Sequence, residues 1–281
     1  LLWYPVQYEG MESSKNIVYM GAAPNQQIVP AIEYLLDQGY TRFFLLGSDY
    51  VFPRTANMII NAQIDAVDGA EVVGEEYAAM DQTEFSSIIS KIEAAQPDVI
   101  INTLNGTGNV SFFKQLADRN ITSDTMMTMS FSIAEEEVQT IGADILKGNL
   151  VSWNYYETTD TEKNQEFVKA YKEKYGEDRV TSDPAEAAYD AVYMWKAACE
   201  KAGSFDTDAV REALDGLSID APEGTITVNG ENQHISKPVR IGEVREDGLI
   251  YEVSATDGPV EPDPYLTTYD WAVKAGVQPL E

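Results

Sequence analysis

The sequence predicts an α/β protein built around a parallel sheet that helices cover on both faces. Short apolar runs alternate with amphipathic stretches over the first two thirds of the chain, the pattern of repeated strand–helix–strand units. A length of 281 residues, 44% of them hydrophobic, is enough to bury a substantial core and suggests two domains.

The strands are expected where short apolar runs are bounded by turn-forming residues. Seven such runs cover residues 1–6, 17–20, 42–46, 71–73, 99–103, 126–129 and 150–153. Amphipathic stretches between the strands predict helices in residues 27–38, 54–67, 82–95, 110–119 and 133–141. Because helices alternate with strands, the strands are expected to run parallel.

Two longer helices and a strand-and-turn region complete the predicted structure. The helices, residues 162–175 and 184–202, each end at a glycine. The second begins with Asp183 as its N-cap and Pro184 at its first position, and Glu186 stands three residues after the cap. A short helix in residues 206–217 and strands in residues 225–228, 239–244 and 249–253 follow.

The charge of the chain excludes two classes of partner. It has 19 Lys and Arg against 47 Asp and Glu, a formal net charge of −28. Nucleic acid and anionic membrane surfaces would repel it. The acids are spread along the whole length, which is typical of a solvated acidic surface in a salt-adapted or an acidic secreted protein.

No apolar run is long enough to cross a bilayer, so we expect no direct membrane insertion. The opening residues show no signal-peptide pattern.

Signals for catalysis and for metal or cofactor binding are poor. The single cysteine, Cys199, excludes an internal disulfide and a multi-thiolate metal site, and its helical spacing among apolar residues favours the core. The single histidine, His234, lies in the strand-and-turn region, where stabilising a turn is favoured over acting as a general base. No nucleophile, phosphate-loop or zinc-protease motif occurs, so we expect no catalytic residue, metal or cofactor. The three glutamates at 135–137 are expected to form a solvated helix face.

Candidate binding residues follow the predicted strands, because ligands of open parallel sheets bind outside the carboxyl ends of the strands. These residues carry hydroxyl, amide or aromatic groups, and they are Tyr4, Tyr50, Asn105, Ser132 and Tyr155. Their loops have almost no Lys, Arg or His. Such groups suit a small, flat, neutral ligand such as urea or a short amide, whereas an anion would favour arginine. Each residue has an alternative role, in packing or in capping a helix.

Glu186 has two interpretations. Three residues after Asp183, it can close a capping box at the start of its helix. It also shares a helix face with Tyr189 and Tyr193, so its carboxylate could accept both hydrogens of an amide nitrogen. The spacing alone favours the cap.

Several segments carry a resemblance to a known family. They are Tyr4-Pro-Val-Gln-Tyr-Glu-Gly-Met-Glu, Gly21-Ala-Ala-Pro-Asn-Gln-Gln-Ile, Gly47-Ser-Asp-Tyr-Val-Phe-Pro-Arg, Ile101-Asn-Thr-Leu-Asn-Gly, Trp153-Asn-Tyr, Asp183-Pro-Ala-Glu-Ala-Ala-Tyr and Glu231-Asn-Gln-His. With these segments the chain resembles, over essentially its whole length, the urea-binding proteins of ABC transporters and their relatives that bind short-chain amides. The Ala-Ala-Pro-Asn-Gln-Gln segment favours the urea branch, whereas Thr107 and Gly108, where the family usually has Asp-Ser, resemble the amide branch.

The resemblance implies a type I periplasmic-binding-protein fold, in which two α/β lobes joined by hinge crossings close around a ligand. The N-terminal lobe is expected in residues 1–22 and 155–220, and the C-terminal lobe in residues 23–154 and 221–281. Family members carry a long segment before the equivalent of Leu1, so the first lobe is expected to be N-terminally truncated. By position, Tyr4 and Tyr50 match residues that line the family's ligand pocket. The other candidates fall in matching segments, and they are Asn105, Ser132, Tyr155 and Glu186.

The function that the resemblance implies is transport without catalysis. An extracytoplasmic protein, periplasmic or lipid-anchored at the cell surface, would capture urea or a short-chain amide and deliver it to an ABC permease. One alternative is a cytoplasmic amide-sensing regulator of the same fold, which a signal peptide or lipobox at the genuine N-terminus would exclude. The other is an amide hydrolase, for which the sequence shows no nucleophile–base pair.

Overall fold

The largest element of the structure is a seven-stranded sheet with the order β12-β11-β7-β6-β5-β3-β4. The computed structural model describes residues 1–278. The five strands in the middle of the chain pair in parallel. Of the last two strands, β11 pairs antiparallel with β7, and β12 pairs antiparallel with β11. The strands are β3 (Arg42–Ser48), β4 (Glu71–Ala78), β5 (Val99–Thr103), β6 (Met127–Ser130), β7 (Leu150–Trp153), β11 (Arg240–Val244) and β12 (Ile250–Ala255). The predicted α/β class with a mostly parallel sheet is therefore confirmed.

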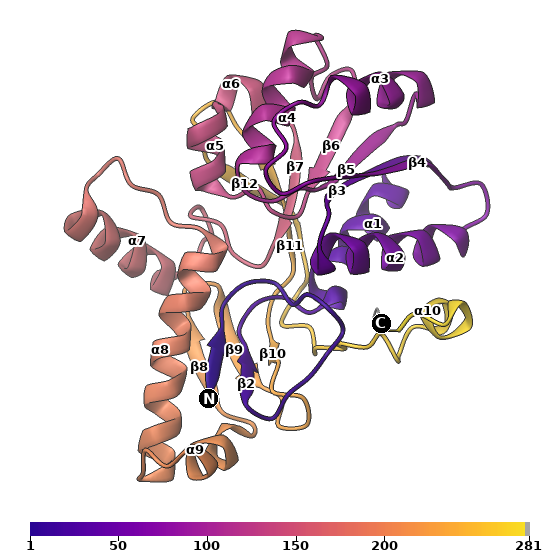
Figure 1. Ribbon diagram of the computed structural model, residues 1–281. Helices are drawn as coiled ribbons and strands as arrows, with labels where there is room; N and C mark the ends of the chain where they lie inside the picture. Colours follow the sequence, from indigo (N-terminus) through magenta and orange to yellow (C-terminus); the bar gives the residue numbers. More distant parts are fainter. Residues whose placement is uncertain (279–281) are drawn as a thin grey trace.

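Helices cover both faces of this large sheet (Figure 1). On one face lie α1 (Ile28–Asp37), α2 (Val51–Asp65) and α10 (Asp270–Ala275), and on the other α3 (Ser86–Ala95), α4 (Thr107–Asp118), α5 (Glu135–Ile141) and α6 (Ala143–Leu146). In β3, Phe43 and Leu45 join the first core and Phe44 and Leu46 the second, because successive side chains of a strand point to opposite faces. Burial of each such side chain stabilises the fold by roughly 1.5–3 kcal/mol.

The rest of the chain forms a small layer beside the large sheet (Figure 1). Its strands are β1 (Leu2–Tyr4) and β2 (Ile17–Tyr19), which pair in parallel, and β8 (Ser218–Ala221), β9 (Gly224–Val228) and β10 (Ile235–Ser236), which pair antiparallel. A bridge between Tyr19 and His234 joins the two small sheets. The helices α8 (Asp183–Ala202) and α9 (Thr207–Leu214) pack on this layer through a core that includes Val18, Met194 and Ile226, and α7 (Glu162–Tyr175) lies beside α8.

One predicted boundary falls inside a structural element. Ala221 pairs with Gly224 in the β8–β9 hairpin, with only Pro222 and Glu223 between them. The division that the sequence places between residues 220 and 221 therefore cuts through this hairpin, and β9 and β10 stand with the small layer. The predicted short helix also ends early, at Leu214, and β8 takes the chain from Ser218.

Three crossing segments connect the small layer with the large sheet within the described residues: residues 20–27, 154–161 and 237–239. Buried amides tie them together, because backbone groups in such a crossing need partners when water is excluded. The side-chain nitrogen of Gln27 donates to the carbonyl of Ser152 at 2.7 Å, and that of Gln26 to the carbonyl of Ile235 at 2.9 Å. Along residues 1–278, no helix has both the length and the apolar character needed to cross a membrane.

Candidate ligand-binding site

Three of the predicted binding residues follow neighbouring strands of the large sheet. Tyr50 stands between β3 and α2, Asn105 follows β5, and Ser132 follows β6, and all three are half-buried. The backbone N–H of Asn105 donates to Ser48 Oγ at 3.0 Å, which holds the loops after β5 and β3 together. This is the carboxyl edge of the parallel strands, the position in which the sequence predicts a binding site.

Residues 4–12 bring the small layer to this edge. The side-chain nitrogen of Gln7 donates to the carbonyl of Phe131 at 3.1 Å and to Ser132 Oγ at 3.2 Å. Tyr4, at the end of β1, is half-buried and packs against the same apolar core as Tyr50. The structure thus brings Tyr4, Tyr50, Asn105 and Ser132 to one edge, with contributions from both parts of the chain.

Glu9 is a residue of this edge that the sequence analysis did not single out. Burial, followed by the negative charges of Glu9 and Glu12, raises the pKa of Tyr4 to about 12. Burial and then the charge of Glu9 also raise the pKa of Tyr50, so the charge of this carboxylate acts on both phenols. Burial is the main reason why the pKa of Glu9 itself is raised. The one signal in the sequence is that Glu9 stands in the Tyr4-Pro-Val-Gln-Tyr-Glu segment.

The charges around this edge are acidic. The nearest arginine along the chain, Arg54, is engaged elsewhere: its Nη2 lies 2.6 Å from Asp49 Oδ1, and its guanidinium lies 4.4 Å from the ring centre of Tyr77. Phenol hydroxyls, an asparagine amide and a carboxylate can all accept hydrogen bonds from N–H groups, and the phenols and the amide can also donate to a carbonyl oxygen. The edge therefore offers hydrogen-bond partners of the kind that an amide or an ammonium group can use.

Tyr155 lies elsewhere, in spite of following β7. Its side chain is fully buried, and its hydroxyl donates to Asn164 Oδ1 at 2.7 Å and lies 2.7 Å from Thr181 Oγ1. Its ring packs edge-on against Phe167 of α7. The hydrogen-bonding capacity of this tyrosine is used inside the protein, where it fixes α7 to the segment before α8.

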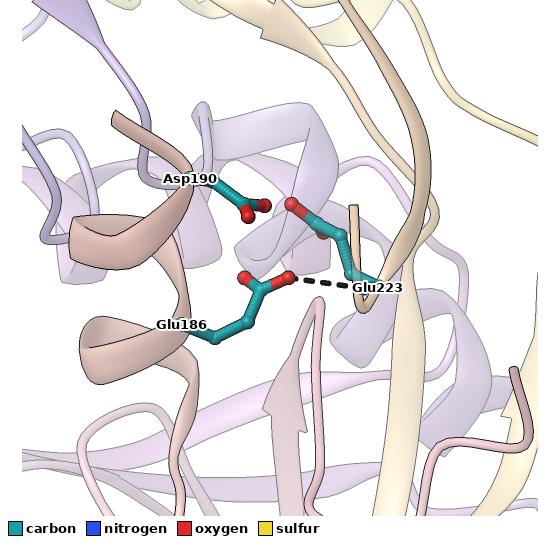
Figure 2. A group of neighbouring side chains, drawn as sticks. All are labelled: Glu186, Asp190 and Glu223. Carbon is teal, nitrogen blue, oxygen red and sulfur yellow. Dashed lines mark hydrogen bonds between the residues drawn. The ribbon is translucent and has the colours of Figure 1, made fainter. Parts of the chain in front are cut away.

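Glu186 does not close a capping box, and its side chain is fully buried. The N-cap of α8 is Ser182, and Asp183 is the first helical residue, so no capping box forms around Asp183. The Asp183 carboxylate instead accepts the backbone N–H groups of Asn154 and Tyr155, at 3.0 and 3.1 Å. Glu186 is sealed in the interior, where Figure 2 shows it in a cluster with Asp190 and Glu223.

The expectation of a solvated glutamate face at 135–137 is wrong for its first residue. Glu135 is fully buried and accepts the backbone N–H of Glu157 at 2.8 Å, and burial raises its pKa. Only Glu136 is exposed, and it accepts a hydrogen bond from Ser182 Oγ at 2.9 Å. The start of α5 therefore binds the crossing segment 154–161 and the residues before α8.

The chain was compared with known proteins. A family model described as periplasmic binding protein domain matches residues 1–270. Among curated proteins, the Leu/Ile/Val-binding protein homolog 6 of Brucella melitensis is 24% identical over 247 residues, which cover 86% of this chain and 63% of that protein. A protein named limonene hydroxylase from Geobacillus stearothermophilus is 28% identical over 127 residues, 45% of this chain and 23% of that protein. The chain thus spans less than two thirds of these relatives.

Among solved structures, the solute-binding protein of an ABC transporter from Rhodopseudomonas palustris HaA2, in complex with p-hydroxybenzoic acid, has a TM-score of 0.78 at 24% identity. The match covers 87% of this chain and 68% of that one, and at this identity it shows a shared fold. Together with the family match over residues 1–270, it accounts for the large parallel sheet and the crossing segments. The chain belongs to the periplasmic binding protein domain family.

Proposed function

We propose that this chain belongs to an extracytoplasmic solute-binding protein that captures a small polar ligand and delivers it to an ABC permease, without a catalytic step. The family membership supports this proposal, as do relatives named as substrate-binding proteins. The site includes residues from both sides of the crossing segments, so a ligand that touches both sides favours the closed arrangement.

The ligand that the site supports best is urea or a short-chain amide. The observation that carries this proposal is that the polar side chains of Tyr50, Asn105 and Ser132 gather at the carboxyl edge of the sheet, where the charge of Glu9 acts on the phenols of Tyr4 and Tyr50. Glu9 would accept the N–H groups of an amide, and the phenol hydroxyls or the Asn105 amide would donate to its carbonyl. The negative charge of Glu9 disfavours a carboxylate ligand at the same place.

In this proposal Tyr4, Tyr50, Asn105 and Ser132 contact the ligand, with Glu9 added to them. Tyr155 and Glu186 act from the interior, by fixing α7 and α8. A branched-chain amino acid is the second candidate ligand, because Glu9 can also pair with an ammonium group and one relative is named for such ligands.

Isothermal titration of urea, acetamide, leucine and 4-hydroxybenzoate into the full-length protein tests the proposal. Urea or acetamide is expected to bind, and Glu9→Gln is expected to weaken that binding at least tenfold, which corresponds to about 1.4 kcal/mol. Glu246→Gln, an exposed acid on the β11–β12 turn, is the matched control and should leave affinity unchanged. Binding of 4-hydroxybenzoate alone would contradict the ligand, and no binding of any of the four would contradict the site.

Two alternatives require separate measurements. Ammonia release during incubation with urea or acetamide would show a hydrolase. A native leader or lipobox supports the extracytoplasmic location, whereas a cytoplasmic location together with acetamide binding would support the regulator.

A further inference from the structure

The small layer contains a buried cluster of three carboxylates that the proposed transport function does not use. Glu186 and Asp190 lie one turn apart on α8, and Glu223 comes from the β8–β9 turn (Figure 2). Each contributes an oxygen to a group in which all the oxygens lie within 4.8 Å of one another. The three residues are only 0–1% exposed. Three like charges so close and so deeply buried repel one another unless something neutralises them.

Most oxygens of the cluster have no hydrogen-bond partner among residues 1–278. Glu186 Oε1 accepts the backbone N–H of Glu223 at 2.9 Å. Glu186 Oε2, Asp190 Oδ2 and Glu223 Oε2 have no such partner in that part of the chain, and Glu223 Oε1 pairs with the Lys237 ammonium at 3.2 Å. The Asp190 side chain, 1% exposed, points into the cluster (Figure 2). Unpaired buried carboxylate oxygens cost several kcal/mol, so the vacant lone pairs point to a bound cation.

If all three carboxylates are ionised, the cluster and its neighbouring lysine carry a net charge of about −2. Lys237 is also fully buried, and its Nζ lies 3.2 Å from Glu223 Oε1 and donates to the carbonyl of Met20 at 2.8 Å. It offsets one of the three carboxylates. The nearby Asp183 and Arg240 are both engaged elsewhere: each bonds to backbone groups, and Arg240 also pairs with the Glu252 carboxylate at 2.9 Å. A divalent cation would make the cluster neutral.

The ligand set and its dimensions fit calcium. All the ligand atoms are carboxylate oxygens, which hard cations prefer, and the cluster has no histidine or thiolate that would favour zinc. Calcium binds oxygen at about 2.3–2.6 Å, so ligands on opposite sides of the ion lie about 4.6–5.2 Å apart. The three oxygens lie within 4.8 Å of one another, close enough for one such ion to bind all of them. Magnesium binds at about 2.0–2.1 Å and requires a tighter octahedron.

The cluster also has an access route. A cavity of about 560 Å³ lies between α7 and α8, and Asp190 is one of its lining residues. Pro222, the neighbour of Glu223, lines the same cavity, together with aromatic side chains such as Tyr189 and Tyr193. An ion entering from this groove would meet Asp190 first.

We infer that Glu186, Asp190 and Glu223 form a calcium site that fastens α8 to the β8–β9 turn. The sequence predicts no metal site, because Glu223 is 37 residues from Glu186 in the chain and joins it only in the folded protein. If protonation of the carboxylates relieves their repulsion instead, no metal is needed, and added calcium should not change the melting temperature.

Thermal unfolding and isothermal titration with calcium, at constant ionic strength, test the inference on the full chain after treatment with a chelator. One calcium ion per protein is expected, with a rise in melting temperature of about 5 °C or more at a hundredfold excess over Kd. The variants Glu186→Gln and Asp190→Asn preserve shape and should each weaken calcium binding at least tenfold. Magnesium is expected to give a smaller rise at the same concentration.

A matched control separates this site from weak binding to the acidic surface. The double variant Glu246→Gln and Asp257→Asn removes two exposed charges and should keep the full response to calcium. A calcium response that is equal in Glu186→Gln, Asp190→Asn and the control would overturn the inference, and so would the lack of any response in the wild-type protein. If one cluster variant fails to fold, the other variant and the stoichiometry of the wild-type protein still decide. Because urea binding is measured separately, failure here leaves the proposed transport function untouched.

Discussion

The side-chain amide of Asn154 donates a 2.7 Å hydrogen bond to the carbonyl of Pro238, which joins the second and third crossing segments. The same nitrogen donates at 3.1 Å to the carbonyl of Gln26 in the first crossing segment. One fully buried side chain therefore links all three crossings. Any hinge movement between the small layer and the large sheet has to preserve or rearrange these two hydrogen bonds.

Replacing Asn154 with alanine should destabilise the protein by about 2–4 kcal/mol, because two buried carbonyls lose their partner. Chemical denaturation measures the change. Asn16→Ala, at an exposed position, is the matched control and should change stability by no more than about 0.5 kcal/mol. Equal stability of the two variants would mean that Asn154 does not hold the crossings.

Replacing Tyr50 with phenylalanine should weaken binding of urea or acetamide about tenfold, since the hydroxyl is lost and the ring remains. Isothermal titration measures this, with Tyr251→Phe as control because that tyrosine bonds to Asp247 on the β11–β12 turn. An unchanged affinity in Tyr50→Phe would remove this hydroxyl from the site.

Replacing Tyr155 with phenylalanine should lower the stability of the protein and leave ligand affinity nearly unchanged, in contrast to Tyr50→Phe. The hydroxyl bonds to Asn164 and Thr181 in the interior, so its loss should cost about 1–3 kcal/mol of stability and change ligand affinity less than twofold. Denaturation and titration on the same preparation measure both. A large loss of affinity at full stability would instead make Tyr155 a ligand contact.

The buried imidazole of His234 should make the stability of the protein sensitive to acid. It stacks on Tyr19 with ring centres 4.1 Å apart, its ring nitrogens have no hydrogen-bond partner in the described part of the chain, and burial lowers its pKa from 6.5 to about 3. Between these two values the unfolded chain binds a proton that the folded protein does not. The free energy of unfolding should therefore fall as the pH is lowered from 6.5 towards 3, by up to about 1.4 kcal/mol per pH unit.

Denaturation at a series of pH values measures this slope, and His234→Phe, which keeps a flat ring beside Tyr19, should reduce it. An identical slope in the variant would assign the acid sensitivity to other groups. Above pH 6.5 the imidazole is neutral in both states, so the two proteins should respond alike to pH.

Salt should stabilise the protein. Self-repulsion from a net charge of −28 is screened as the Debye length falls from about 10 Å at 0.1 M to about 3 Å at 1 M salt. The melting temperature is expected to rise between these KCl concentrations. A flat response would contradict the hypothesis of a salt-adapted surface.

The sequence by itself determined the parallel strands of the large sheet and the helices between them. The run from Phe43 to Leu46 is apolar at every position because both faces of β3 are covered, and turn formers mark where each strand ends. The rule that ligands bind after parallel strands then places Tyr50, Asn105 and Ser132 correctly on one edge, because it depends only on chain direction.

Only the tertiary structure decided which side chains face one another. Tyr155 and Glu186 stand in segments that resemble the family, yet both side chains are fully buried. The charge of Glu9 acts on Tyr50, and the backbone N–H of Glu223 bonds to the Glu186 carboxylate, across long stretches of chain. The spacing of apolar residues in a short stretch of sequence indicates its secondary structure and average burial. These contacts depend instead on how distant segments pack, and a short stretch of sequence does not contain that information.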